Sequence, residues 1–278
     1  MSSREEFNPA AIGADLVGTR FSAHLHHFPS AQSTNTLLLE AAANGAPEGT
    51  VYIADEQTLG RGRGGHAWHS APGDGLYVSI LAKPSLHLRE ALWISLATAL
   101  ASQAAIKSTA GVDVDLRWPN DLLIPQSSGP GKKLGGILVE TAVEPDAAAT
   151  LRYAVIGIGI NIHHEAFPPD LMRLATSLRL STGTQQSRNN LLLALLRALD
   201  LELTKLESQH PDLLQRFTDG STWVHGKHVH VPEHGGYDGI TAGLDERGFL
   251  LIDMEDGSRR TVLSGGVREV RTSTSLPL

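Results

Sequence analysis

The sequence predicts an α+β protein in which a larger domain of mixed strands and helices is followed by a small β module. Two long segments, 88–111 and 191–206, carry apolar residues at helical spacing. Shorter apolar or alternating runs, such as 75–83 and 151–162, have the length and composition of strands. From about residue 221 onward only short β-type segments and glycine turns remain, which indicates a separate compact barrel.

In the first half of the chain, each expected element has its own local signal. Residues 1–20 show no clear pattern and are expected to form a loose arm. Ser33 or Thr34 caps a helix that ends near Asn44, where Gly45 follows. Gly111 closes the helix that begins near residue 88. The expected strands of this half are 20–28, 51–57, 75–83 and 113–118.

The second half begins with two strands, 133–144 and 151–162, which are expected to pair as a hairpin. A loop with one short helix is expected over 163–187, and Pro211 is placed to begin a further helix after 191–206. The expected domains are an N-terminal arm, a catalytic domain and a C-terminal barrel, at 1–20, 21–220 and 221–278.

Composition limits the classes of protein that fit. The 278-residue chain has 41% hydrophobic and 19% charged residues, as ordinary globular proteins do. It has no cysteine, which excludes disulfides, thiolate nucleophiles and cysteine zinc sites. The net charge of −7 argues against a broad nucleic-acid surface. The N-terminus lacks a secretory signal and no run reaches the roughly 18 apolar residues of a membrane helix, so we expect a cytoplasmic protein without membrane contact.

The stretch QTLGRGRGGHAWHS, residues 57–70, combines four glycines with two arginines directly after an expected strand. Glycine lets backbone N–H groups approach an anion closely, and the guanidinium groups of Arg61 and Arg63 suit phosphate or carboxylate. An anion-binding loop is therefore the favoured interpretation. A flexible turn without a ligand and an RNA contact of the RGG type remain alternatives.

Three further motifs lie at the ends of expected strands. RWPNDLL, 117–123, places Asn120 and Asp121 in a turn, which alone fits a structural turn beside a core Trp equally well. KLGGILVE, 133–140, places Lys133 beside two glycines, where a ligand can lie against the backbone. GIGIN, 157–161, ends an apolar strand, and tight strand packing is its alternative interpretation.

The order of these motifs resembles that of the biotin protein ligases. GRGR at 60–63, a Trp at 68, RWPND and KLGGILVE follow one another at the family's distances, and the resemblance extends from about residue 21 to the C-terminus. It implies a mixed-sheet catalytic domain like that of the class II synthetases, with a C-terminal SH3-like barrel. It also implies that biotin and ATP form biotinyl-5′-AMP and pyrophosphate, after which biotin passes to one lysine of a biotin carboxyl carrier protein. Mg²⁺ is then expected to be bound largely through ATP phosphates and water, with no metal site formed by the protein itself.

The resemblance also implies roles for individual residues. Lys133, Arg61 and Arg63 are the expected catalytic cations, with Lys133 between the biotin carboxylate and the α-phosphate. The residues expected to bind biotin are Ser33, Thr34, Asn35, Gln57, Gly60, Arg61, Gly62, Arg63, Gly64, Gly65, Trp68, Lys133, Gly135 and Gly136. The residues expected to contact the nucleotide are Asn120, Asp121, Gly157, Gly159 and Asn161, with Asn120, Asp121 and Asn161 also candidates for magnesium.

Two departures from the family are visible. Many relatives carry further basic residues where this chain has Gly64 and His66, so the loop's positive charge is lower here and partly depends on protonation of His66. Some bacterial members also carry an N-terminal DNA-binding domain of ~60 residues. Only about 20 residues precede the first expected strand here, so no DNA binding is expected. Whether the protein is a monomer or a homodimer stays open.

Other functions are compatible with parts of the pattern. A lipoate or octanoate protein ligase shares the fold and the acyl-adenylate chemistry, but the GRGR loop with RWPND favours biotin. A binder that holds biotin without transferring it is disfavoured by the intact lysine and arginines. The clustered histidines His24, His26, His27, His228 and His230 are expected to be neutral surface or partly buried residues and not metal ligands.

Overall fold

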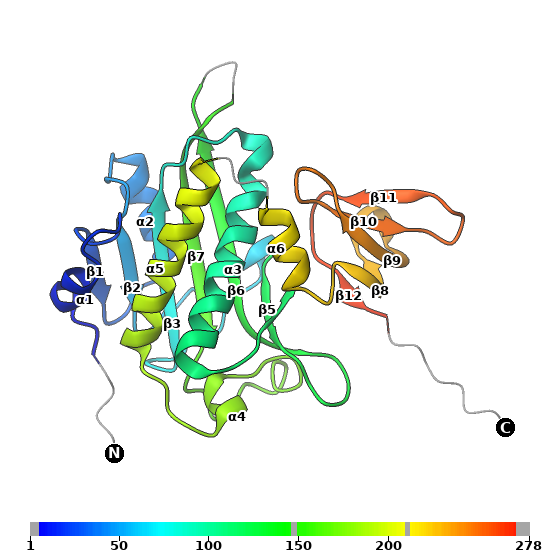
Figure 1. Ribbon diagram of the computed structural model, residues 1–278. Coiled ribbons are helices and arrows are strands. Elements are labelled where there is room, and N and C mark those ends of the chain that lie inside the picture. Colours follow the sequence, from blue (N-terminus) through cyan, green and yellow to red (C-terminus); the bar gives the residue numbers. More distant parts are fainter. Residues whose placement is uncertain (1–5, 146–148, 209–211, 271–278) are drawn as a thin grey trace.

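The structure is a computed structural model that describes residues 6–145, 149–208 and 212–270. A seven-stranded sheet forms the centre of the larger unit (Figure 1). Its strands are β1 (Leu25–Phe28), β2 (Val51–Ala54), β3 (Gly75–Ala82), β4 (Asp115–Arg117), β5 (Asp121–Ile124), β6 (Lys132–Val143) and β7 (Leu151–Asn161). Their spatial order is β1-β2-β3-β7-β6-β5-β4. Only β1 and β2 run parallel, so the sheet is mixed, as predicted.

Helices α3 and α5 cover one face of this sheet (Figure 1). The helices are α1 (Pro9–Asp15), α2 (Thr34–Ala43), α3 (Ala91–Ala110), α4 (Leu178–Thr182), α5 (Arg188–Glu207) and α6 (Leu213–Asp219). The predicted cap and stop are confirmed: the Ser33 side chain accepts from the Thr36 amide, and Gly111 ends α3 at a φ of 70°. Within the described ranges, no helix is both long and apolar enough to cross a membrane.

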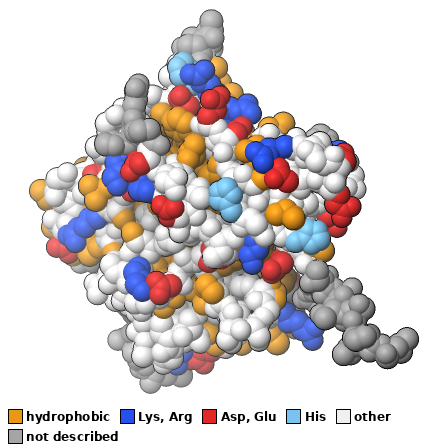
Figure 2. Space-filling model, turned by 45° about the vertical axis from the view of Figure 1, so that its right-hand side comes forward, with side chains coloured by type: hydrophobic (Ala, Val, Ile, Leu, Met, Phe, Trp, Pro, Cys, Tyr) orange, Lys and Arg blue, Asp and Glu red, His pale blue; other side chains and the backbone are white. Residues whose placement is uncertain are grey.

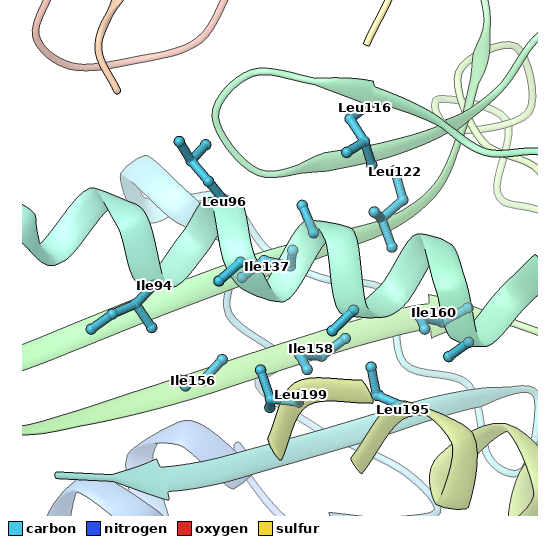
Figure 3. Packing of buried hydrophobic residues seen from close by; sticks show 14 of the residues in the cluster. Ile94, Leu96, Leu116, Leu122, Ile137, Ile156, Ile158, Ile160, Leu195 and Leu199 are labelled. Carbon is cyan, nitrogen blue, oxygen red and sulfur yellow. The ribbon is translucent and has the colours of Figure 1, made fainter. Parts of the chain in front are cut away.

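The two faces of β7 have different roles. Ile156 and Ile158 point toward the helices and lie in one buried cluster with Leu195 of α5 (Figure 3). Successive residues of a strand point to opposite faces, so Gly157 and Gly159 face away from the helices. The face covered by α3 and α5 therefore holds the main core, and on the other face Gly157 and Gly159 add no side chains of their own.

The N-terminal segment differs from the sequence prediction. Residues 9–15 form α1 and not a loose arm, with the Asn8 side chain as its N-cap. Ile12 and Leu16 are buried, and α1 packs against β1 and α5. The strand expected over 20–28 begins only at Leu25. Residues 1–5 and the predicted helix start at Pro211 lie outside the described residues.

The C-terminal unit is an antiparallel five-stranded sheet beside α6 (Figure 1), consistent with the predicted SH3-like barrel. Its strands are β8 (His225–Val231), β9 (Tyr237–Leu244), β10 (Leu250–Asp253), β11 (Arg259–Val262) and β12 (Arg268–Glu269), in the order β11-β10-β9-β8-β12. Buried Trp118 links the two units, since its Nε1 donates to the Gly248 carbonyl at 2.9 Å. On the molecular face in Figure 2, cationic and anionic side chains are interspersed.

Candidate active site

A pocket lies on the glycine face of the sheet, between the start of α2, the loop after β2, and strands β6 and β7. The structure brings together many of the residues that the sequence predicts for the site. Those that line the pocket are Ser33, Thr34, Asn35, Gln57, Arg61, Gly62, Arg63, Trp68, Asn120, Lys133, Gly136, Gly157 and Gly159.

The start of α2 and Gln57 contribute uncharged hydrogen-bonding groups to the pocket. Gln57 Oε1 accepts from the Thr34 amide at 2.9 Å and from the Thr34 hydroxyl at 3.1 Å. Gln57 Nε2 donates to Ser70 Oγ at 3.0 Å. Ser79 of β3 donates to Asn35 Oδ1 at 2.6 Å. These bonds fix the side chains at the start of α2, so the pocket offers donors and acceptors in defined positions.

The floor of the pocket requires glycine because other side chains lie directly on it. A Cβ at Gly157 would be 2.2 Å from Asn35 Oδ1, and one at Gly159 would be 2.5 Å from the Trp68 ring. Trp68 Nε1 is buried and has no hydrogen-bond partner among the residues described. This N–H is therefore a donor in the pocket wall that a ligand can satisfy.

The loop arginines are anchored on different parts of the molecule. Arg61 pairs with Glu140 of β6, with Nη2–Oε1 at 2.7 Å and Nη1–Oε2 at 3.0 Å. Arg63 donates across the molecule to the carbonyl of Gly265 in the C-terminal unit. Burial lowers the pKa of Arg63, and the carboxylates of Asp121 and Glu233 oppose that shift. Both arginines line the pocket, and the charge of Arg61 is paired there with the Glu140 carboxylate.

Lys133 at the start of β6 provides the third cation. Its Nζ lies 2.5 Å from Asp121 Oδ1 and 5.4 Å from the centroid of the Trp68 ring. Arg117 binds the other oxygen of Asp121, with Nη2–Oδ2 at 2.5 Å. Burial alone would raise the pKa of the Asp121 carboxyl, but the two cations hold that pKa below its ordinary value.

Several predicted site residues do not line the pocket. These are Gly60, Gly64, Gly65, Gly135, Asp121 and Asn161. Gly64 and Gly65 have φ angles of 65° and 79°, so they shape the turn of the loop. Asn161 is buried and donates to the carbonyl of Thr176 at 3.0 Å, which gives it a structural role.

The residues do not fit a magnesium site built by the protein. Both oxygens of Asp121 are bound by cations, and the Asn120 amide donates to the carbonyl of Ile137 at 2.8 Å. In the part of the chain that the structure describes, no three His, Cys, Asp or Glu side chains are grouped as metal ligands.

Two polar residues that hold predicted site residues in place were not predicted from the sequence. Ser79 donates to Asn35, and Glu140 pairs with Arg61. A serine in the otherwise apolar run GLYVSILA and a glutamate ending KLGGILVE were the available signals, because polar groups on buried strands need partners.

The fold and the pocket together define a class of protein. A mixed-sheet domain carries a glycine-floored pocket lined by uncharged polar side chains and three cationic residues, and a small antiparallel β unit follows it. Residues 27–161 match the biotin/lipoate A/B protein ligase family, and residues 224–267 match the biotin protein ligase C-terminal domain.

Individual relatives agree with these matches. The chain is 34% identical over 243 residues to the biotin–[acetyl-CoA-carboxylase] ligase of Mycobacterium tuberculosis, covering 84% of each chain. It is 32% identical over 240 residues to the bifunctional ligase/repressor BirA of Bacillus subtilis, covering 85% of this chain and 71% of that protein. The structure of the Aquifex aeolicus biotin protein ligase with biotin and ATP superposes with a TM-score of 0.74, at 29% identity, over 90% of this chain and 100% of that one. The chain belongs to the biotin protein ligases, and it is an enzyme of the ligase class.

Proposed function

We propose that this protein activates biotin with ATP and transfers it to a lysine of a biotin carboxyl carrier protein, and that the pocket on the glycine face carries out both steps. The observation that carries the proposal is that Arg61, Arg63 and Lys133 line the same pocket as the uncharged polar side chains of Ser33, Thr34, Asn35 and Gln57. Biotin needs both kinds of group, because its ureido ring is neutral and its carboxylate is negative. Relatives named as ligases of biotin support the assignment.

Biotin would lie along the glycine floor with its ureido ring at the start of α2. There the hydroxyl and amide groups of Ser33, Thr34, Asn35 and Gln57 supply the donors and acceptors that a neutral polar ring requires. Gly136, Gly157 and Gly159 leave room for the side chains of Asn35, Trp68 and Lys133 on the floor, and biotin would lie beside those side chains. The Trp68 indole covers this floor and provides an N–H donor that has no partner within the described chain.

The first step joins two anions. A carboxylate oxygen of biotin attacks the α-phosphorus of ATP, the bond from that phosphorus to the bridging oxygen breaks, and pyrophosphate leaves. Lys133 would lie where the carboxylate and the phosphate meet, and Arg61 and Arg63, which line the same pocket, would add positive charge near them. Fixed positive charge at this place offsets the repulsion and stabilises the charge that develops in the transition state. Asn120, which also lines the pocket, is our candidate for nucleotide contact.

The second step transfers the acyl group. The uncharged amine of the acceptor lysine attacks the carbonyl carbon of biotinyl-5′-AMP, an amide bond forms, the acyl–phosphate bond breaks and AMP leaves. The glycine loop would cover the mixed anhydride until the acceptor arrives, because closing a loop over a reactive intermediate excludes water and other nucleophiles.

The proposal is tested by acyl transfer to a defined acceptor. The purified protein is incubated with biotin, magnesium-ATP and a biotin carboxyl carrier domain, and the carrier is analysed by intact mass. We expect one biotinyl group on the wild-type carrier and none on a carrier whose acceptor lysine is replaced by arginine. An unmodified wild-type carrier, or one modified only when lipoate replaces biotin, would overturn the proposal.

A further inference from the structure

Asp121 lies between two cations that come from different places. Lys133 binds its Oδ1 at 2.5 Å, and Arg117 binds its Oδ2 through Nη2 at 2.5 Å and through Nε at 3.1 Å. Arg117 and Asp121 are direct neighbours across the β4–β5 hairpin, so this pair is built into the sheet. Lys133 lines the pocket, whereas Arg117 does not.

Arg117 is held in turn by the start of the C-terminal unit. Its guanidinium carbon lies 5.2 Å from the centroid of the Trp223 ring, and Trp223 is buried, with 3% of its surface exposed. A planar guanidinium stacks well on an aromatic face, and a buried ring cannot turn away from it.

The segment that carries Trp223 is itself fixed to β4. The Leu116 amide donates to the Gly220 carbonyl at 3.2 Å, and the Thr222 amide and hydroxyl donate to the Asp115 carboxylate at 2.8 and 2.7 Å. The junction between the two units therefore determines where the Trp223 ring lies, and with it the plane of Arg117.

We propose that Arg117, held against Trp223, is a positioning residue that sets the charge available at Lys133 by sharing the carboxylate of Asp121. One carboxylate facing one ammonium is a neutral pair, which would hold Lys133 on Asp121 and weaken its field in the pocket. With Arg117 on the second oxygen, the group of three carries one net positive charge. Lys133 is then bound less tightly by Asp121, and its ammonium group can interact with the two substrate anions.

This role of Arg117 rests on the proposed role of Lys133. The experiment below distinguishes a failure of the Arg117 role from a failure of the proposed function. The rate of biotinyl-5′-AMP formation is measured in the full-length protein with magnesium-ATP at varied biotin. Arg117→Met should lower kcat about tenfold to 100-fold and change the biotin KM less than about threefold, because the loss concerns the transition state and not biotin binding. Arg117→Lys, which keeps the charge, should recover part of the rate.

Trp223 is tested by comparing two replacements. Trp223→Phe, which keeps an aromatic face, should stay closer to wild type than Trp223→Leu. Because Trp223 acts through Arg117, the double variant Arg117→Met/Trp223→Leu should be no slower than Arg117→Met alone. The control is Lys227→Met, since Lys227 Nζ also lies over the Trp223 ring, at 5.3 Å, but pairs with Glu269. The rate of biotinyl-5′-AMP formation in Lys227→Met should remain within about twofold of the wild-type rate.

Thermal unfolding and calorimetric biotin binding show whether each variant is folded. If Arg117→Met does not fold, the rates of Arg117→Lys and Trp223→Phe are compared with the wild-type rate instead. If Arg117→Met is folded and forms biotinyl-5′-AMP at the wild-type rate, the role of Arg117 is overturned. If Arg117→Met is unfolded, wild-type rates in both Arg117→Lys and Trp223→Phe overturn that role. Multiplying losses in the double variant overturn the link through Trp223. Wild-type protein that forms no biotinyl-5′-AMP overturns the proposed function and this inference together.

Discussion

Arg61 and Glu140 form a two-point ion pair, and Glu140 Oε2 also accepts from Asn35 Nδ2 at 3.1 Å. One carboxylate thus joins a loop arginine to a side-chain amide of the pocket. We expect Glu140→Ala to weaken biotin binding about threefold to tenfold, because Asn35 and Arg61 both lose this carboxylate as a partner. The folding stability should change by less than about 1 kcal/mol, since the pair is partly exposed. Calorimetry with Glu144→Ala as control tests this, and an unchanged biotin Kd in Glu140→Ala would contradict it.

The glycine floor is expected to be intolerant of a single methyl group. Gly157→Ala would place a Cβ 2.2 Å from Asn35 Oδ1, so Asn35 must move. We expect biotin affinity to fall more than about tenfold while the protein still folds, because a displaced Asn35 leaves polar groups unpaired. Gly266→Ala, whose Cβ meets nothing within 4 Å, is the matched control. Biotin binding by Gly157→Ala at the wild-type affinity would rule out this floor as the ligand's resting place.

The charge of Lys133 should determine the rate of adenylate formation, whereas the charge of the adjacent Lys132 should not. Lys133→Ala is expected to slow adenylate formation by at least about 100-fold, because it removes a charge placed at the reacting groups. Lys132→Ala, on the same strand but outside the pocket, should stay close to wild type. Single-turnover mass spectrometry of biotinyl-5′-AMP gives both rates. A loss smaller than about tenfold in Lys133→Ala would refute the assigned role.

Arg63 is expected to contain the intermediate. Its contact with the Gly265 carbonyl ties the glycine loop to the C-terminal unit, and Arg63→Gly removes both the tie and a positive charge. We expect adenylate formation to fall by less than about tenfold while biotinylation of a bystander protein rises by at least that factor, because the loop no longer covers the anhydride. Exposed Arg89, replaced by alanine, is the control. If Arg63→Gly still modifies only the carrier, the loop has no containment role.

Buried His164 is expected to make stability depend on pH. It is 1% exposed and stacks on Phe167 at 4.8 Å, and burial lowers its pKa to about 4, with His69 and His163 adding to the shift and Asp74 opposing it. The unfolded chain therefore binds a proton at higher pH than the folded one does. The contribution of His164 to the free energy of unfolding is complete above pH ~6.5 and is lost as pH falls toward 4. At pH 5 the loss is about 2 kcal/mol.

The measurement is urea unfolding at pH 7.5 and pH 5 in wild type and in His164→Phe. The variant should lose less stability between the two pH values than wild type does. His24→Gln, at an exposed position, should keep the wild-type difference. Equal pH dependence in His164→Phe and wild type would show that His164 is not the group responsible.

Much of the fold could be predicted because its signals are local. The caps at Ser33 and Gly111 and the apolar strand at 151–162 depend on neighbours in sequence, and the structure confirms them. Helix α1 was missed because Ile12 and the following Leu16 are too few apolar residues to predict a helix on their own. They are buried because α1 packs against β1 and against α5, which is distant in sequence.

The site shows the same limit. The glycines and cations of the loop and of β6 were predicted from motifs, and many of them line one pocket. The partners that hold those cations could not be predicted, since Glu140 lies 79 residues from Arg61 and Gly265 lies 202 from Arg63. Asp121 was expected to face a nucleotide or magnesium, but its two oxygens are bound by Lys133 and Arg117.

The proposed function requires that the pocket activate biotin in particular. The most direct measurement is mass spectrometry of the purified protein with magnesium-ATP and, in parallel, biotin, lipoate or octanoate. We predict biotinyl-5′-AMP with biotin and no acyl-adenylate with the other two acids. A lipoyl or octanoyl adenylate, or no adenylate from any of the three, would contradict the account.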